Sequence, residues 1–314
     1  MICYGPVPSR RLGRSLGINN IPSPKMCTYS CIYCQIGVTN KFCNTPQPFY
    51  EPDIIFSQVK KHLEKLSPTD RPDYLTFVSN GEPTLDSNLG KTIQLLKKLG
   101  FPVAVITNGS LLNLKEVRRN LKNADWVSVK VDANDEEVWK SINLPGEGIF
   151  FENYIEGILK FSRKFKGILT TETMLVEGVN DDTKILSRTA NLISAIHPVK
   201  AYLSIPIRPP AISAVKVPSE TTINKAYQIF HWKIDQTELM LGFEGTGLAS
   251  TGNPIEDITN ICAVHPIRED SLQELLGKYK GGSDILEILL HGNHIEKVKY
   301  QSQTFYIRKF HNSL

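Results

Sequence analysis

The chain lacks any long apolar run and contains only six cysteines and four methionines. No stretch of its 314 residues approaches the roughly 18 uninterrupted apolar residues that a membrane-spanning helix needs. The first residues, Met1-Ile-Cys-Tyr-Gly-Pro-Val-Pro, have no apolar core of the kind that a signal peptide carries. We therefore expect a cytoplasmic protein with no membrane partner.

Acidic residues are absent from the first 50 positions, although the whole chain carries a net charge of only +4. The same segment holds five basic residues, namely Arg10, Arg11, Arg14, Lys25 and Lys41. A basic rim attracts anionic ligands when it borders a site. A solvated basic arm explains the charge equally well, so composition alone leaves both interpretations open.

Half of the cysteines lie within eight residues, in Cys27-Thr-Tyr-Ser-Cys31-Ile-Tyr-Cys34. Such crowding is not typical of a disulfide framework, and it fits a reducing compartment in which thiols stay available for metal. Three thiolates on one loop can bind three irons of a [4Fe–4S] cluster and leave the fourth iron open, as a reactive site requires. The alternative is a zinc site completed by Cys43 or a histidine such as His62, and the spacing favours the iron–sulfur cluster.

Short β-rich runs alternate with segments of helical periodicity between about residues 15 and 235. The run Tyr74-Leu-Thr-Phe-Val-Ser, for example, precedes Thr92-Ile-Gln-Leu-Leu-Lys-Lys-Leu, which stops at Gly100. About six such units follow one another, which implies parallel strands joined by right-handed crossovers. We predict an α/β fold, a partial (β/α)6 barrel with its chemistry at the carboxyl ends of the strands. A doubly wound open sheet is the alternative.

The pattern changes after about residue 255. Two helical segments precede two strands, at 266–276, 283–292, 296–300 and 304–310. We predict a barrel domain over residues 1–258 and a small winged-helix-like domain over residues 259–314. Basic residues on the predicted hairpin suit phosphate, but the tail is nearly charge-balanced, which favours a packing or substrate-lid role over nucleic-acid binding.

Polar residues stand where three of the predicted strands end. One strand runs into Ser79-Asn80-Gly81-Glu82-Pro83, where a carboxylate and free carbonyls suit an ammonium group. The next strand ends at Asn108, whose amide both donates and accepts hydrogen bonds. One face of the following strand carries Ser128, Lys130 and Asp132. Polar groups are costly in a dry core, so we expect a wet or ligand-filled barrel mouth there, although ordinary turns remain an alternative for the loops.

One arginine further along the chain is a candidate for substrate binding. Arg208 lies between prolines in Pro206-Ile-Arg208-Pro-Pro. Its planar guanidinium can bind a carboxylate or a phosphate with two parallel hydrogen bonds. An ordinary surface arginine is the alternative.

The cysteine spacing resembles the signature of the radical S-adenosylmethionine (SAM) superfamily, and Asn80-Gly81-Glu82-Pro83 resembles its GGEP segment, with Asn80 replacing the first glycine. The resemblance covers approximately residues 15–235. It implies that Cys27, Cys31 and Cys34 hold a [4Fe–4S] cluster, and that SAM binds its open iron and is cleaved to a 5′-deoxyadenosyl radical. By the same resemblance, SAM is contacted by Tyr33, Asn80, Gly81, Glu82, Pro83, Asn108, Ser128 and Lys130.

A narrower resemblance rests on the segments that begin at Gly5, Arg208 and His265, and it points to iron–sulfur oxidoreductases similar to the wyosine synthases that modify tRNA. Those synthases carry further cysteines upstream for a second cluster, whereas only Cys3 precedes the motif here. Cys3, Cys43 and Cys262 are therefore better interpreted as inert residues than as ligands of a second cluster.

The resemblance also implies partners. They are an electron donor such as ferredoxin or flavodoxin and an RNA base or a peptide or protein as substrate. A different class of function remains as the alternative. It is a non-catalytic nucleic-acid-binding regulator whose cysteine loop senses redox state or binds zinc.

Overall fold

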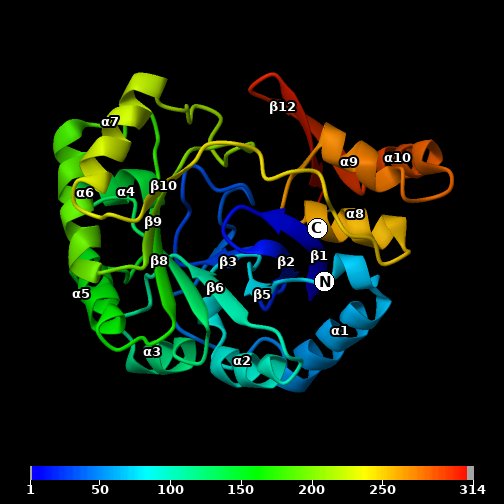
Figure 1. The fold of residues 1–314 in the computed structure, drawn as a ribbon, viewed down its shortest axis with the longest axis horizontal. Coiled ribbons are helices and arrows are strands. Elements are labelled where there is room, and N and C mark those ends of the chain that lie inside the picture. Colours follow the sequence, from blue (N-terminus) through cyan, green and yellow to red (C-terminus); the bar gives the residue numbers. More distant parts are fainter. Residues whose placement is uncertain (1, 310–314) are drawn as a thin grey trace.

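A curled sheet of eight strands dominates the computed structural model, which describes residues 2–309. The strands lie side by side in the order β1 (Cys3–Ser9), β2 (Gly13–Ile18), β5 (Tyr74–Phe77), β6 (Val103–Thr107), β7 (Trp126–Lys130), β8 (Ile168–Met174), β9 (Lys200–Ser204) and β10 (Thr237–Met240). Strand β1 is antiparallel to β2, and all other neighbours are parallel. The sheet leaves β1 and β10 as its edges, which confirms the predicted partial barrel (Figure 1).

Helices cover the outside of the curled sheet (Figure 1). They are α1 (Pro52–Lys65), α2 (Leu89–Lys97), α3 (Lys115–Leu121), α4 (Glu136–Asn143), α5 (Phe151–Ser162), α6 (Thr183–Ile196) and α7 (Glu220–His231). Local signals begin some of them: Asp135 accepts a hydrogen bond from Val138 N at the start of α4, and Asp182 accepts one from Lys184 N at the start of α6. Short 3-10 turns lie at Pro68–Asp70 and Pro83–Leu85.

The two faces of the sheet bury different kinds of side chain. Outward residues such as Val105 and Val127 pack against the helices in the main core. Inside the barrel, Trp126 and Tyr202 cluster with Leu12, which comes from the turn between β1 and β2. Because side chains alternate, the even-numbered residues further along the same strands also point inward. Polar groups near the strand ends therefore face one interior space above an apolar plug.

The sequence analysis did not predict strand β1. Pro6 and Pro8 interrupt its apolar run, and proline lacks the amide hydrogen that a central strand needs. The strand tolerates them because it lies at the edge of the sheet. The short strand β10 and helix α4 were not predicted either.

The C-terminal segment contains three helices and a small sheet. These are α8 (Pro254–Cys262), β11 (Ile267–Arg268), α9 (Glu269–Leu276), α10 (Gly282–His291), β12 (Ile295–Tyr300) and β13 (Gln303–Arg308), with strand order β11-β13-β12. The two predicted helices and the hairpin are present, α8 and β11 are additional, and Phe310 of the predicted last strand lies outside the described residues. The winged-helix-like assignment and the boundary at 258/259 stay predictions, and α8 spans that boundary.

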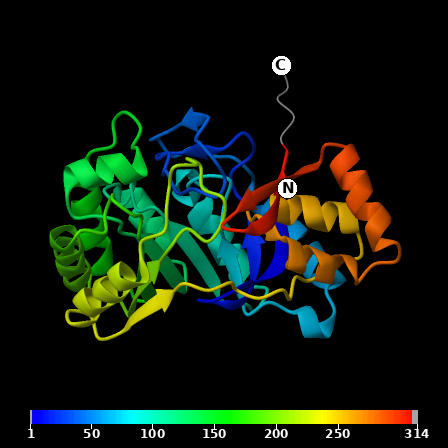
Figure 2. The same ribbon diagram turned by 90° about the horizontal axis from the view of Figure 1, so that it is seen from above.

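The C-terminal elements pack against the start of the chain. Tyr4 and Val7 of β1 share a hydrophobic cluster with Ile258 and Leu272, and Figure 2 shows these orange and red elements beside the blue N-terminal strands.

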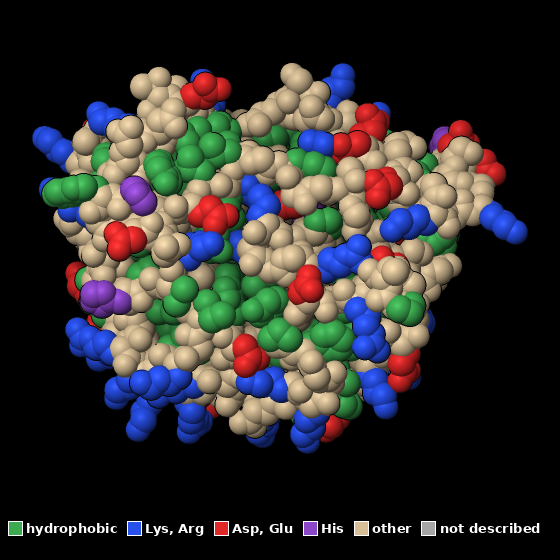
Figure 3. Space-filling model, in the orientation of Figure 1, with side chains coloured by type: hydrophobic (Ala, Val, Ile, Leu, Met, Phe, Trp, Pro, Cys, Tyr) green, Lys and Arg blue, Asp and Glu red, His purple; other side chains and the backbone are tan. Residues whose placement is uncertain are grey.

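Lys and Arg side chains line the lower edge of the face in Figure 3, over α2 and α3. Within residues 2–309, no helix combines the length and the apolar character needed to cross a membrane.

Candidate active site

The three clustered cysteines lie at one cavity of about 310 Å³, lined also by residues from the ends of the parallel strands. Cys27 and Cys31 belong to a loop that Figure 2 shows in blue beside the yellow-green segment after β9. The two segments are in direct contact, since the amide of Ile212 donates a hydrogen bond of 3.0 Å to the carbonyl of Ile32. The site is thus formed by the segment between β2 and β5 together with the segment after β9.

The glycine–glutamate–proline segment holds the start of the cysteine loop. The amide of Met26 donates to the carbonyl of Asn80, and the amide of Glu82 donates to the carbonyl of Met26, each at 3.2 Å. Gly81 lies between these two bonds with a φ of 141°, and a Cβ placed on it would stand 1.7 Å from Met26 O. Only glycine allows this approach, so residue 81 is required as a structural support for Cys27.

We expect Gly81→Ala to lower the cluster content of the protein severely. The added methyl group cannot occupy its ideal position against Met26 O, and the strand pairing that positions Cys27 must shift. Iron and sulfide analysis after anaerobic reconstitution measures the effect. Gly178→Ala is the matched control, because Gly178 also has a positive φ but its Cβ would meet no atom within 4 Å. Equal cluster content in the two variants would contradict the role given to Gly81.

Each of the three thiols receives a hydrogen bond from a different side chain. Asn108 Nδ2 lies 3.6 Å from Cys27 Sγ and Asn143 Nδ2 lies 3.4 Å from Cys31 Sγ. Lys25 Nζ lies 3.2 Å from Cys34 Sγ and also donates to the carbonyl of Gly37. Donors of this kind stabilise thiolate ligands and tune the potential of an iron–sulfur cluster.

The surroundings of the sulfur atoms suit a multi-iron group better than a single ion. Burial, helped by nearby Glu82 and Asp132 respectively, raises the pKa of Cys27 and that of Cys31 to about 12, so both thiols need a strongly bound cation to ionise. Zinc collects its four ligands around one atom. Within residues 2–309, no three His, Cys, Asp or Glu side chains lie close enough to hold one metal ion. The three cysteines border one cavity, and their thiolates would hold a [4Fe–4S] cluster there.

Glu82 is buried and held by four hydrogen bonds. Its Oε1 accepts from the amide and hydroxyl of Thr84 and from the hydroxyl of Thr107, whereas Oε2 has a single donor within residues 2–309, the amide of Asn108 at 2.8 Å. Burial raises the pKa of Glu82, and the hydrogen bonds oppose that shift. The side chain lines the cavity, so Oε2 keeps an acceptor position for a ligand such as an ammonium group.

Asp132 links the cysteine loop to the barrel. Its Oδ2 accepts from the hydroxyl of Tyr33 and, at 2.8 Å, from Asn143 Nδ2, while its Oδ1 accepts from the amide of Met174. The sequence analysis predicted a polar strand face that includes Asp132 but assigned no role to this residue. Its position shows that it orients Tyr33 and the amide that contacts Cys31, and it is therefore a positioning residue.

Lys130 and Glu172 form an ion pair between the neighbouring strands β7 and β8 at the cavity. Lys130 Nζ lies 2.9 Å from Glu172 Oε1 and 5.0 Å from the centre of the Tyr33 ring. Arg11, from the turn between β1 and β2, pairs with the other oxygen of Glu172. Burial lowers the pKa of Lys130, and nearby Asp132 opposes that shift. The sequence named Lys130, but the pairing with Glu172 joins residues too distant in the chain to predict.

Only some of the residues predicted to contact SAM line the cysteine cavity. The structure brings Tyr33, Gly81, Glu82, Asn108 and Lys130 to the cysteine cavity. Two others do not line it: Ser128 is fully buried in the barrel, and Pro83 is buried with its carbonyl accepting a hydrogen bond from Asn20 Nδ2.

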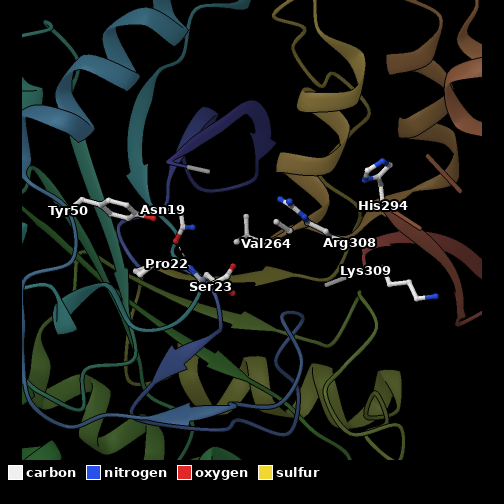
Figure 4. A pocket seen from close by; sticks show the side chains of 10 residues that line it. Asn19, Pro22, Ser23, Tyr50, Val264, His294, Arg308 and Lys309 are labelled. Carbon is white, nitrogen blue, oxygen red and sulfur yellow. Dashed lines mark hydrogen bonds between the residues drawn. The ribbon is translucent and has the colours of Figure 1, made fainter. Parts of the chain in front are cut away.

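Asn80 lines a second cavity, of about 280 Å³, with Ser23 and residues of the C-terminal segment (Figure 4). In Figure 4, Asn19 and Ser23 face Arg308 across this space, while Lys309 points away. The turn at Gly81 explains why Asn80 and Glu82 line different cavities. The two residues flank Gly81, and the backbone changes direction between them.

A second charged group closes the cysteine cavity on the side of the C-terminal segment. Arg208 lies 2.6 Å from Glu244 Oε2, 3.0 Å from Gln35 Oε1 and 3.2 Å from His265 Nε2. Arg10 Nη2 lies 3.7 Å from Glu244 Oε1. Arg208 is thus already paired with protein side chains, which the sequence around it did not indicate.

The half-buried His265 predicts a loss of stability in acid. Burial and then Arg208 lower the pKa of His265 to about 3, against 6.5 in the unfolded chain. Below pH 6.5 the unfolded state therefore binds more protons, and stability falls as the pH falls toward 3, by at most about 1.4 kcal/mol per pH unit from this residue. Urea unfolding of the metal-free protein between pH 7 and 4 measures the slope. His265→Gln, which keeps an acceptor for Arg208, should flatten it, and an unchanged slope would contradict the assignment.

The remaining cysteines lie in different places. Cys3 Sγ lies 3.8 Å from the carbonyl of Gln58, Cys262 Sγ lies 3.4 Å from the carbonyl of Tyr306, and Cys43 accepts a hydrogen bond from Gln47. Cys3 and Cys262 pack in separate hydrophobic clusters. A second cluster bound by these three residues thus has no support from their positions.

A partial parallel barrel with a three-cysteine loop, a glycine followed by a buried glutamate, and polar strand ends around one cavity defines a radical SAM enzyme. The model of the Radical SAM superfamily matches residues 21–188, and the chain belongs to this superfamily. Its members use a [4Fe–4S] cluster and SAM, and a structure of similar fold holds bound SAM.

Several known proteins are similar to this chain in sequence or in fold. The chain is 40% identical to a UPF0026 protein of Methanocaldococcus jannaschii over 98% of its own length and 96% of that protein. It is 26% identical to the S-adenosyl-L-methionine-dependent tRNA 4-demethylwyosine synthase of Pyrococcus horikoshii, over 63% of this chain and 64% of the synthase. The fold is similar to that of TYW1 with a lysine-pyruvate adduct bound, with a TM-score of 0.51, 18% identity and coverage of 71% of this chain and 76% of the other.

Proposed function

We propose that this enzyme reductively cleaves SAM at a [4Fe–4S] cluster held by Cys27, Cys31 and Cys34 and uses the resulting radical to take a hydrogen atom from its substrate. The observation that carries the proposal is the meeting of three thiols, each with its own hydrogen-bond donor, with Glu82 and Lys130 at one cavity. When bound, the cluster supplies the electron that breaks the C5′–S bond of SAM, giving methionine and a 5′-deoxyadenosyl radical that takes a hydrogen atom from the substrate.

The protein residues bind and orient in this scheme. Glu82 would accept a hydrogen bond from the amine of SAM at Oε2, because Glu82 lines the cavity and this oxygen has one donor among residues 2–309. The paired Lys130 and Glu172 border the same space, and Asn108 joins the SAM side to Cys27. The apolar plug around Trp126 excludes water from below, which protects a reactive radical.

The electron comes from a protein donor in the cytoplasm, for which ferredoxin and flavodoxin are the proposed classes. The proposed substrates are an RNA base or a peptide or protein. The relationship to a tRNA-modifying synthase supports the RNA base, and it concerns 63% of this chain.

Anaerobic reconstitution with iron and sulfide, followed by addition of dithionite and SAM, tests the proposal. We expect 5′-deoxyadenosine and methionine in equal amounts, detected by chromatography. Tightly bound zinc in place of iron would overturn the proposal and favour the non-catalytic regulator. A protein of full cluster content that forms no 5′-deoxyadenosine would also overturn the proposal.

A further inference from the structure

The polar groups of the cysteine cavity divide into two sides. One side comes from β5 to β8 and carries Glu82, Asn108 and the pair of Lys130 with Glu172. The other side comes from the turn after β1, the loops after β9 and β10 and the start of the C-terminal segment. It carries Arg10, Arg208, Glu244 and His265, whereas Arg11 of the same turn reaches the first side and pairs with Glu172. The proposed function uses only the first side.

Arg10 has unused hydrogen-bonding capacity on this second side. Its Nε and Nη1 atoms are buried and have no hydrogen-bond partner among residues 2–309, and its Nη2 is 3.7 Å from Glu244. A guanidinium has five donors and no acceptor, so only an acceptor from a ligand or water can satisfy these atoms. Leaving a charged group unsatisfied in this way is costly.

The charges of the second side leave a positive excess. Arg10 and Arg208 share the single carboxylate of Glu244. Arg208 and Arg10 help to keep the pKa of Glu244 low against the effect of burial, so the carboxylate is ionised, whereas His265, with its lowered pKa, is neutral at pH 7. Two cations therefore face one anion around a cavity, which favours a ligand with one further negative charge.

We propose that Arg10, supported by Arg208, binds an anionic group of the substrate, a carboxylate or a phosphate, on the side of the cavity opposite the SAM contacts. The inference rests on the proposed function, because it takes the side from β5 to β8 as the SAM site. A planar guanidinium with adjacent open donors matches either oxyanion. Glu244 holds the two arginines at the edge of the site, and binding of the substrate anion replaces part of its pairing.

Calorimetric titration of the reconstituted full-length protein, saturated with SAM and at fixed low ionic strength, tests this inference. The probes are inorganic phosphate and acetate, in separate arms. We expect Arg10→Gln to weaken binding of the preferred probe by roughly 10- to 100-fold, as loss of a charged hydrogen bond does. Arg14→Gln is the matched control, because Arg14 belongs to the same segment but pairs with Asp70 outside the cavity. It should bind within about twofold of the parent.

Glu244→Gln provides a second test. Its expected result is tighter binding, which misfolding cannot produce. Removing the shared carboxylate charge frees both guanidinium groups, so we expect this variant to bind the probe about tenfold more tightly. Preference for phosphate would indicate a nucleotide or another phosphorylated substrate, and preference for acetate would indicate a carboxylate substrate.

The outcomes separate the two proposals. Absence of Arg10-dependent binding in a protein that does form 5′-deoxyadenosine would overturn the anion site alone. Equal weakening of SAM binding and probe binding in Arg10→Gln would also overturn it, since the arginine would then hold the carboxylate of SAM. Probe binding in a protein that forms no 5′-deoxyadenosine would overturn the proposed function, and with it the assignment of the anion to a substrate.

Discussion

Cys31→Ala is expected to abolish 5′-deoxyadenosine formation and to leave the protein without a stable [4Fe–4S] cluster. Cys31 is one of three thiols at the cavity, and its replacement leaves two ligands for a cluster that already has one open iron. The fold should persist, because Cys31 lies in a loop and alanine keeps the backbone hydrogen bond between Cys34 and residue 31. Iron content, the visible absorption of the cluster and the 5′-deoxyadenosine assay measure the result.

Cys43→Ala is the matched control for this experiment. Cys43 is also half-buried and lies close to the same loop, since its amide donates to the carbonyl of Cys27. Its sulfur does not line the cavity, however. We expect the variant to retain cluster and activity. Loss of both in Cys43→Ala would assign a cluster ligand outside the three-cysteine motif and contradict the site described here.

The sequence predicted the part of the site that depends on local spacing. Three cysteines within eight residues and a glycine–glutamate–proline segment are recognisable because each lies in one short stretch. Which way the side chains point was harder to predict. Asn80 and Glu82 differ by two positions, yet the turn at Gly81 sends them to different cavities. That turn is required by the close approach of Met26, which the sequence does not show.

Long-range pairing accounts for most of what the sequence missed. The repeated strand–helix pattern predicted the barrel, but not the antiparallel edge strand that carries Arg10 and Arg11 into it. Arg208 was named as the anion-binding candidate, and the structure shows it already paired with Glu244 and His265. Arg10, 198 positions earlier in the chain, retains the open donors. Only the curvature of the sheet brings these two arginines together.

Asp132→Ala is expected to reduce cluster content strongly while leaving all three cysteines in place. The substitution removes the acceptor that Tyr33, Asn143 and the amide of Met174 share. Each buried donor left unsatisfied costs about 1–3 kcal/mol, so the metal-free protein should lose roughly 3 kcal/mol or more of stability. Asn143 would also lose the contact that holds its amide toward Cys31. Urea unfolding and iron analysis measure the two effects.

Asp135→Ala separates these effects from a general loss of stability. Asp135 caps α4 through Val138, and its replacement should cost about 1 kcal/mol. Its carboxylate contacts neither the cysteine loop nor Tyr33, pairing instead with Arg188. We therefore expect normal cluster content in this variant. If Asp132→Ala keeps its cluster as well, the three thiols and their direct donors suffice, and Asp132 stabilises the barrel without positioning the loop. A selective loss of iron in Asp132→Ala would instead mean that the strand end, through Asn143, sets the geometry of the metal site.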